Sequence, residues 1–236
     1  MDPQIFLNAA EEVEYIEKFY SEKMFLVVDE EFISFEKKSD RFRVGFHEYL
    51  ISVGEYNASE LARMEALDWE AQNVDPLLMI HSVTIDSALV SLWVFFENKL
   101  KKLLIKYYFY APYTPVDEKG RPMDRDVFCQ KVNRLKFEGV LYYFSEMFKL
   151  NLTDEVSHTL REFNLLINSI KHGDGPSFNA IKDEFPDRVE DSARFLPESE
   201  FLVRKREDVG LLAGAIKDVF KSAAATAPHA TPNVQQ

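Results

Sequence analysis

Apolar residues recur every three or four positions from residue 85 to residue 104, and this spacing constrains the fold more than any other feature of the sequence. The main stripe consists of Ile85, Leu89, Leu92, Phe96 and Leu103. Because an α-helix presents one face every 3.6 residues, the pattern predicts a long helix from Pro76 to the proline-rich segment 111–115. Its most apolar part, residues 87–96, is half as long as the roughly 20 residues of a membrane span. We therefore expect a buried core helix and no membrane contact.

Most of the remaining chain has the same helical period and few breakers. The sequence contains only 8 glycines in 236 residues. Further helices are predicted over residues 6–35 with a break near 27–29, 60–72, 125–148 with an interruption at Gly139, 154–172, and 207–220. Gly45 and Gly54 are expected in loops, residues 174–197 in an irregular surface segment, and residues 201–204 in a short strand. The predicted fold class is all-α.

The predicted helices suggest three parts of the chain. Residues 1–76 are expected to form an N-terminal helical extension packed on the core, and residues 77–221 a helical bundle. Residues 222–236 contain no charged side chain when His229 is neutral, and few large apolar ones. Such a segment buries too little apolar area to offset its ordering entropy, so we predict a disordered tail. Truncation after Lys221 is accordingly expected to leave stability nearly unchanged.

The charge and cysteine content narrow the functional classes. The net charge of −12 and the pI near 5.0 argue against non-specific coating of nucleic acid. Two basic clusters, residues 99–106 and 204–206, leave two interpretations open: a local RNA-binding patch or a solvated face. The tyrosine-rich run 107–110 is likewise either a stacking surface for RNA bases or core. One cysteine, Cys129, and a start without a signal-peptide pattern favour a cytoplasmic protein.

The sequence contains none of the common motifs for phosphate, zinc or calcium binding, so no cofactor and no metal are expected. The segment that remains for chemistry is residues 161–175. On a helix, Asn168 and His172 are one turn apart, and Arg161 falls near the same face. An imidazole can act as acid or base near neutral pH, and a neighbouring cation can stabilise charge that develops on a phosphate.

This segment resembles the HEPN superfamily, whose late helix carries an arginine, often an asparagine after it, and a histidine further on. Asn168, His172 and the following Gly-Asp-Gly match that pattern. The resemblance extends over residues 77–221, through Glu97-Asn-Lys-Leu-Lys101 and through the sequence from Arg206 to Phe220. It implies a helical bundle of HEPN type, preceded here by extra N-terminal helices. Nucleases of this family are metal-independent ribonucleases that act as dimers, often as toxins or in antiphage defence.

The sequence departs from the family pattern at the arginine. The motif spacing places it at position 165, 166 or 167, and the chain has Leu165, Leu166 and Ile167 there. Arg161 is about 16 Å from His172 along a helix axis, and Lys171 points roughly 100° away from it. The candidate site residues are thus His172, Asn168, Lys171, Arg161 and Glu97. Glu97 is expected to pair with Arg161 or Lys171, because a lone carboxylate is costly to bury.

Three functions are compatible with these residues. The first is a non-catalytic or weakened HEPN-like module that binds RNA or a protein partner in bacterial stress or defence. The second is an active ribonuclease that uses His172. The third is a structural helical adaptor, in which His172 only caps its helix and Asn168 is solvated. The resemblance also implies a homodimer in which the faces bearing Asn168 and His172 meet.

Overall fold

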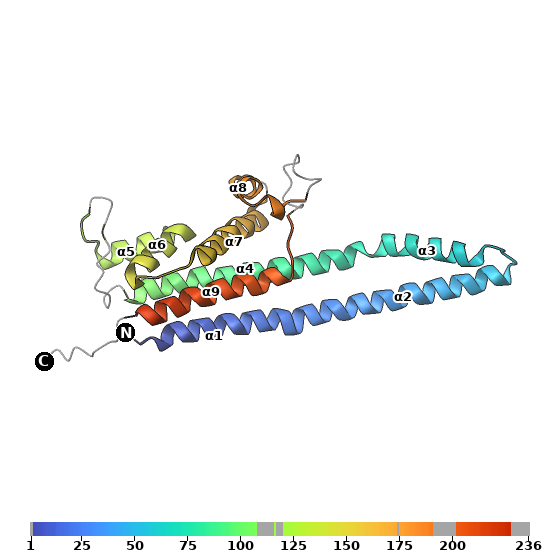
Figure 1. Cartoon of the computed structure of the whole chain (residues 1–236), viewed down its shortest axis with the longest axis horizontal. Helices are drawn as coiled ribbons and strands as arrows, with labels where there is room; N and C mark the ends of the chain where they lie inside the picture. Colours follow the sequence, from blue (N-terminus) through green and yellow to red (C-terminus); the bar gives the residue numbers. More distant parts are fainter. Residues whose placement is uncertain (1, 108–115, 117–119, 174, 191–201, 228–236) are drawn as a thin grey trace. The chain divides into compact units, whose positions relative to one another are not determined.

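The computed structural model of the chain is all-α, as the periodicity predicts, and it describes residues 2–107, 116, 120–173, 175–190 and 202–227 (Figure 1). The described part contains no β-strand, only isolated bridges between Val116 and Pro122 and between Val189 and Leu202. In chain order the helical elements are α1 (Gln4–Phe19), the π-helical η1 (Tyr20–Met24), α2 (Phe25–Ser52), α3 (Ala58–Asn73), α4 (Asp75–Tyr107), α5 (Arg125–Arg134), α6 (Phe137–Phe148), α7 (Asp154–His172), α8 (Pro176–Glu184), the 3₁₀ turn η2 (Pro186–Arg188) and α9 (Glu207–Thr226).

These elements form two compact units. The first unit contains residues 1–17 and 86–236, and the second contains residues 18–85. The predicted boundary between residues 76 and 77 is therefore wrong: it falls inside α4, and the first helix belongs with the later ones. Hydrophobic periodicity marks helices but does not show which of them share a core, since that depends on contacts between distant segments.

In the first unit, α4 packs against both α1 and α9. Lys99 of α4 binds both carboxylate oxygens of Glu12 at 2.7 Å. One turn earlier on α4, the rings of Phe96 and Phe220 of α9 meet edge to face at 5.7 Å between centroids. The apolar stripe predicted for this helix is buried throughout: Ile85, Leu89, Leu92, Phe96 and Leu103. The prediction of a buried core helix is confirmed for this part of α4.

A buried ion network joins α7, η2 and α9 in the same unit. The guanidinium of Arg188 pairs with Glu162 of α7 and, at 2.7 Å, with Asp208 of α9. It also lies over the Phe163 ring, 5.5 Å from the centroid. Burial opposes the charge on Arg188, but hydrogen bonds to the two carboxylates outweigh burial and raise its pKa. The network fixes the segment that follows α8 against the bundle.

In the second unit, α2 packs against α3 and the first part of α4. The inward side of α2 has residues at alternating spacings of three and four, namely Phe25, Val28, Phe32, Phe35, Ser39, Phe42 and Phe46. Facing them, Ala58, Ala62 and Ala66 are buried on α3. The Trp69 ring stacks on Phe35 at 5.2 Å and on Phe42 at 5.9 Å. Small residues on one helix let the large aromatic rings of the other approach closely.

Several predicted element boundaries are wrong for local reasons. The first break lies at η1 instead of residues 27–29, and Gly45 is inside α2, where the continuing heptad spacing outweighs the modest cost of one glycine. The chain interrupts the predicted helix 125–148 at Leu135 and Lys136, which are extended, and not at Gly139. Pro176 begins α8 within the segment predicted to be irregular, because proline is favoured in a first turn.

The C-terminal helix is also longer than predicted. It continues to Thr226, so the boundary between residues 221 and 222 is not where the helix ends. Ala223 and Ala227 are buried, and Asn151 donates a backbone hydrogen bond to the Ser222 hydroxyl at 3.2 Å. Alanine favours helix even where the sequence lacks large apolar side chains. Residues 228–236 of the predicted tail lie outside the described residues. The predicted strand at 201–204 is reduced to the bridge at Leu202.

Within the described residues, α4 is long and apolar enough to cross a membrane by length and composition alone. This is weak evidence, since the core helix of a soluble protein meets the same criterion, and 33% of its most apolar 18-residue window is buried here.

Candidate functional site

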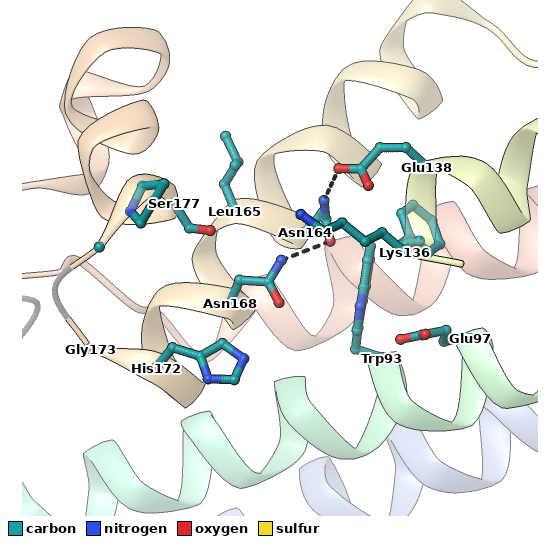
Figure 2. A pocket seen from close by; sticks show the side chains of 13 residues that line it. Trp93, Glu97, Lys136, Glu138, Asn164, Leu165, Asn168, His172, Gly173 and Ser177 are labelled. Atoms are coloured by element: carbon teal, nitrogen blue, oxygen red, sulfur yellow. Dashed lines mark hydrogen bonds between the residues drawn. The ribbon is translucent and has the colours of Figure 1, made fainter. Parts of the chain in front are cut away.

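A cavity of about 520 Å³ in the first unit contains the asparagine and histidine that the sequence analysis identified (Figure 2). Its walls come from α4, α6, α7 and the beginning of α8. The lining side chains with polar groups are Trp93, Glu97, Lys136, Glu138, Asn164, Asn168, His172 and Ser177. Three of the five predicted site residues, Glu97, Asn168 and His172, therefore line one cavity, which we call the α7 pocket.

Local sequence signals place the α7 residues in the pocket. The Thr153 hydroxyl accepts a hydrogen bond from the Val156 backbone N–H at 3.2 Å and so caps the first turn of α7. Gly173 ends the helix with a φ of 68°, which favours glycine. His172 is therefore the last helical residue. Asn164, Asn168 and His172 follow at intervals of four, so all three lie on the face that lines the pocket.

A chain of hydrogen bonds orders the two asparagines. Nδ2 of Asn168 donates to Oδ1 of Asn164 at 3.1 Å, and Nδ2 of Asn164 donates to Oε1 of Glu138 at 2.6 Å (Figure 2). Asn164 is buried and Asn168 half-buried. Each amide is thus held by the next, and the exposed Glu138 carboxylate anchors the chain from α6.

His172 is the most accessible polar group that α7 contributes to the pocket. Its side chain is exposed, and within the described part of the protein it has neither a hydrogen bond nor an ion pair. Figure 2 shows its ring on the same side of α7 as the Asn168 amide. An imidazole that no protein group occupies is available to a ligand as donor or acceptor.

Glu97 lines the pocket from α4, but the predicted pairing with Arg161 or Lys171 is wrong. Its carboxylate pairs with Lys101 one turn later on α4, at 2.6 Å. A neighbour at this spacing on the same helix is always within reach, whereas a pairing between helices depends on their packing.

Arg161 and Lys171 do not line the α7 pocket. Two hydrogen bonds connect Arg161 to Glu184 of α8, at 2.9 and 3.2 Å. They raise the pKa of Arg161 and lower that of Glu184. Lys171 is exposed on another side of α7, as its position in the sequence predicts. Arg161 is one turn before Asn164 on α7, so it is near the predicted face, but its guanidinium is held by Glu184 and lies 3.9 Å from Glu138 beside the pocket instead of lining it.

The positions at which the HEPN pattern has its arginine are all buried. Leu166 and Ile167 are fully buried, and Leu165, which is 7% exposed, also lines the α7 pocket. A guanidinium at position 166 or 167 would lose its hydration without a described carboxylate partner, which is costly. The apolar residues at these two positions therefore belong to the packing of α7 in the core.

Five of the eight lining residues with polar groups were not among the predicted site residues: Trp93, Lys136, Glu138, Asn164 and Ser177. Asn164 had a usable signal, since it lies four residues before Asn168 on a predicted helix. Lys136 and Glu138 had none, because they reach the pocket only through the packing of α6 on α7.

The predicted basic clusters are partly neutralised. Lys99 pairs with Glu12 and Lys101 with Glu97. Arg204 pairs with Asp86 at 2.9 Å; burial raises the pKa of Asp86, and the charge of Arg204 opposes this effect. Tyr107 is buried, and residues 108–110 lie outside the described residues.

No cluster of three or more potential metal-ligating side chains is found in the part of the chain that the structure describes.

Comparison of this chain with family models, with curated proteins and with solved structures finds no match. The resemblance to the HEPN superfamily therefore stays a prediction, based on Asn168, His172 and the surrounding segments. The properties that it implies are proposals.

Proposed function

We propose that this protein is a HEPN-like helical module that binds single-stranded RNA in the α7 pocket and has lost, or nearly lost, the capacity to cleave it. The observation that supports this proposal is the composition of the pocket. Asn168 and His172 line it together, while the positions of the family's arginine are buried. On the family resemblance, we further propose a regulatory role in bacterial stress or defence, with a homodimer as the active form.

The groups of the α7 pocket suit a nucleotide. Its volume of about 520 Å³ is in the range of small-molecule sites. Amide groups such as that of Asn168 form paired hydrogen bonds with base edges. Lys136 supplies positive charge, and the His172 ring a hydrogen-bonding group, for a phosphate at the same cavity. Single-stranded RNA is recognised mainly through hydrogen bonds to the edges of its unstacked bases and through stacking on them, and the asparagine amides of the pocket can supply such hydrogen bonds.

The same pocket is poorly equipped for phosphoryl transfer. Cleavage requires an acid or base and a cation near the charge that develops on the phosphate. His172 meets the first requirement, but no arginine among the described residues lines the pocket, and Glu97 and Glu138 add negative charge. Carboxylates beside a dianionic transition state oppose its formation. These features favour binding over catalysis.

One observation favours an active metal-independent ribonuclease as the second candidate. Lys136, the residue just before α6, lines the pocket next to Asn164 (Figure 2). A lysine there supplies charge that the late helix lacks. In this alternative, His172 acts as the acid or base and Lys136 stabilises the transition state.

Binding is tested with a fluorescent single-stranded RNA and the full chain, by anisotropy across a salt series. We expect saturable binding that weakens about tenfold or more in Asn168→Ala and in Lys136→Ala. His158→Ala is the matched control for His172→Ala, because His158 packs against Phe185 outside the α7 pocket. Absence of binding by the wild-type chain, or equal binding by all four variants, contradicts the proposal.

Cleavage is tested on the same RNA by gel electrophoresis in the presence of a metal chelator. We expect no cleavage, or very slow cleavage, by the wild-type chain. Efficient cleavage that is abolished by His172→Ala and retained by His158→Ala would instead establish the ribonuclease alternative.

A further inference from the structure

The second unit exposes an unusual amount of apolar surface for two layers of helix. Most of the large apolar side chains that are exposed among the described residues belong to residues 18–85. On α2 these include Leu26, Ile33, Val44 and Ile51, each about half exposed. They lie on a different face from the aromatic side that packs on α3 and α4. Exposed apolar surface of this extent indicates an interaction surface.

These four side chains belong to a second, outward-facing seam along α2. The seam has eight positions at alternating spacings of four and three: Leu26, Glu30, Ile33, Lys37, Asp40, Val44, His47 and Ile51. Such spacing keeps all eight within a narrow stripe on one helix, as in a coiled coil. All are exposed except His47, which is half-buried. The inner face of α2 is filled within the chain, whereas the outer seam is mostly open: Asp40 pairs with Arg43 on its own helix at 3.1 Å, and His47 is 3.1 Å from the Ser59 hydroxyl of α3.

The seam is complementary to itself when it is reversed. The spacing reads the same in both directions about a point between Lys38 and Ser39. A two-fold axis at that point places Leu26 opposite Ile51 of the partner subunit and Ile33 opposite Val44 of the partner subunit. It also places Lys37 opposite Asp40 of the partner subunit and Glu30 opposite His47 of the partner subunit. Apolar groups thus meet apolar groups, and acids meet bases.

A parallel arrangement lacks this complementarity. In a parallel two-fold pair each residue meets its own copy, so Lys37 faces lysine and Asp40 faces aspartate. Like charges in direct opposition are destabilising. The flanks of the antiparallel pair do not favour either orientation clearly: Glu36 falls opposite Arg41, which is favourable, but Asp29 falls opposite Glu48, which is unfavourable. The eight seam positions therefore determine the orientation.

We propose that a second copy of this chain docks antiparallel along this seam, so that two α2 helices pack side by side over about 38 Å. The interface is a closed, isologous contact in which every seam pair occurs twice. It involves α2 alone, lies outside the α7 pocket, and does not depend on the proposed RNA binding. The commitment to a second copy rests on the matching of charges under reversal, which a foreign partner has no reason to produce.

Light scattering after size-exclusion chromatography of the full chain at micromolar concentration tests the proposal. We expect twice the chain mass of 27.4 kDa. Lys37→Asp places a carboxylate opposite Asp40 of the partner subunit, and Asp40→Lys places two lysines opposite each other. Each variant should raise the dimer dissociation constant about tenfold or more. Lys38→Asp makes the same charge change about 100° around the helix and should have little effect.

Mixing gives the decisive result. An equimolar mixture of the Lys37→Asp and Asp40→Lys chains restores opposite charges at both positions, so a heterodimer should form where neither variant dimerises alone. Circular dichroism of each variant checks that its helices are intact. A wild-type mass of 27.4 kDa, dimers that all variants retain, or a mixture that stays monomeric each overturns the proposal. If all variants remained dimeric, a contact elsewhere, such as the His172 face, would be favoured.

Cross-linking tests the register in a Cys129→Ser background. Chains with Ile33→Cys and with Val44→Cys should form a mixed disulfide, because these positions are opposite each other. Ile33→Cys alone should not, since its two copies are offset by about 16 Å along the axis, beyond the reach of a disulfide. The reverse result would exclude the antiparallel register.

Discussion

The amide of Asn168 donates to the carbonyl oxygen of Asn164 one helical turn earlier, with Nδ2 and Oδ1 3.1 Å apart. Asn164 is 4% exposed, and its own amide is held in turn by a hydrogen bond to the Glu138 carboxylate. The orientation of Asn168 in the α7 pocket therefore depends on a residue of another helix. Side chains fixed in this way lose less entropy when a ligand binds.

Replacement of Asn164 by aspartate should break this chain. Asn164→Asp places a carboxylate against Glu138, and we expect a loss of roughly 1–3 kcal/mol in the free energy of unfolding near pH 7. Urea melts measure the loss. Adding Glu138→Gln supplies a donor to the new carboxylate and should recover most of the stability. Asn179→Asp on the exposed side of α8 is the control, and an equal loss in that variant would contradict the interpretation.

An arginine introduced at a position where the HEPN pattern has one should not produce ribonuclease activity. Ile167 is fully buried, so Ile167→Arg buries an unpaired charge and should cost about 3–5 kcal/mol of stability. Lys171→Arg, at an exposed position of the same helix, should leave the melting temperature unchanged. Differential scanning calorimetry and the RNA cleavage assay measure both effects. A stable Ile167→Arg protein that cleaves RNA would show that α7 can rotate its motif face into the pocket.

Removal of the Arg188 guanidinium from its ion network should strongly destabilise the first unit. Arg188→Met leaves Glu162 and the buried Asp208 without their shared cation, and we expect a loss of roughly 3–5 kcal/mol. Arg63→Met removes an exposed pair with Glu60 and should change stability by less than about 1 kcal/mol. Similar losses in the two variants, measured by chemical denaturation, would mean that the buried network is replaceable.

The contact between Arg161 and Glu184 predicts a pH effect of known sign. The hydrogen bond from Arg161 lowers the pKa of Glu184 below its ordinary value. A carboxyl with a lowered folded-state pKa stabilises the protein above its unfolded pKa, and the stabilisation is lost as the pH falls through the folded value. NMR titration of the Glu184 carboxyl should show a pKa that rises in Arg161→Met. No change would place Arg161 elsewhere in solution.

The end of α9 predicts a difference between two truncations. A chain that ends after Lys221 loses the buried Ala223 and Ala227 and the Ser222 contact to Asn151. It should be destabilised by roughly 0.5–3 kcal/mol, contrary to the expectation from composition. A chain that ends after Ala227 keeps every described residue of α9 and should melt like the full protein. Equal melting temperatures for the two truncations would show that the last turn of α9 contributes no stability.

The sequence alone was enough to predict the positions of most helices and several of their ends. The stripe along α4 predicted a buried helix, and Asp124 caps α5 by accepting from the Asp126 backbone N–H at 2.8 Å. Thr153 and Gly173 bound α7 at both ends, as predicted. Helical spacing also placed Asn168 and His172 on one face. Each of these inferences depends on residues within a few turns, where helix geometry is fixed by backbone hydrogen bonds.

Only the tertiary structure decided what surrounds those residues. Sequence spacing suggested Arg161 or Lys171 as the partner of Glu97, yet Glu97 pairs within its own helix, and Arg161 is held by Glu184. The pocket acquires Lys136 and Glu138 from α6, which no periodicity connects with α7. The physical reason is that helix periodicity specifies the direction of a side chain from its own axis. The groups that it meets depend on how distant helices pack, and that packing is a property of the whole core.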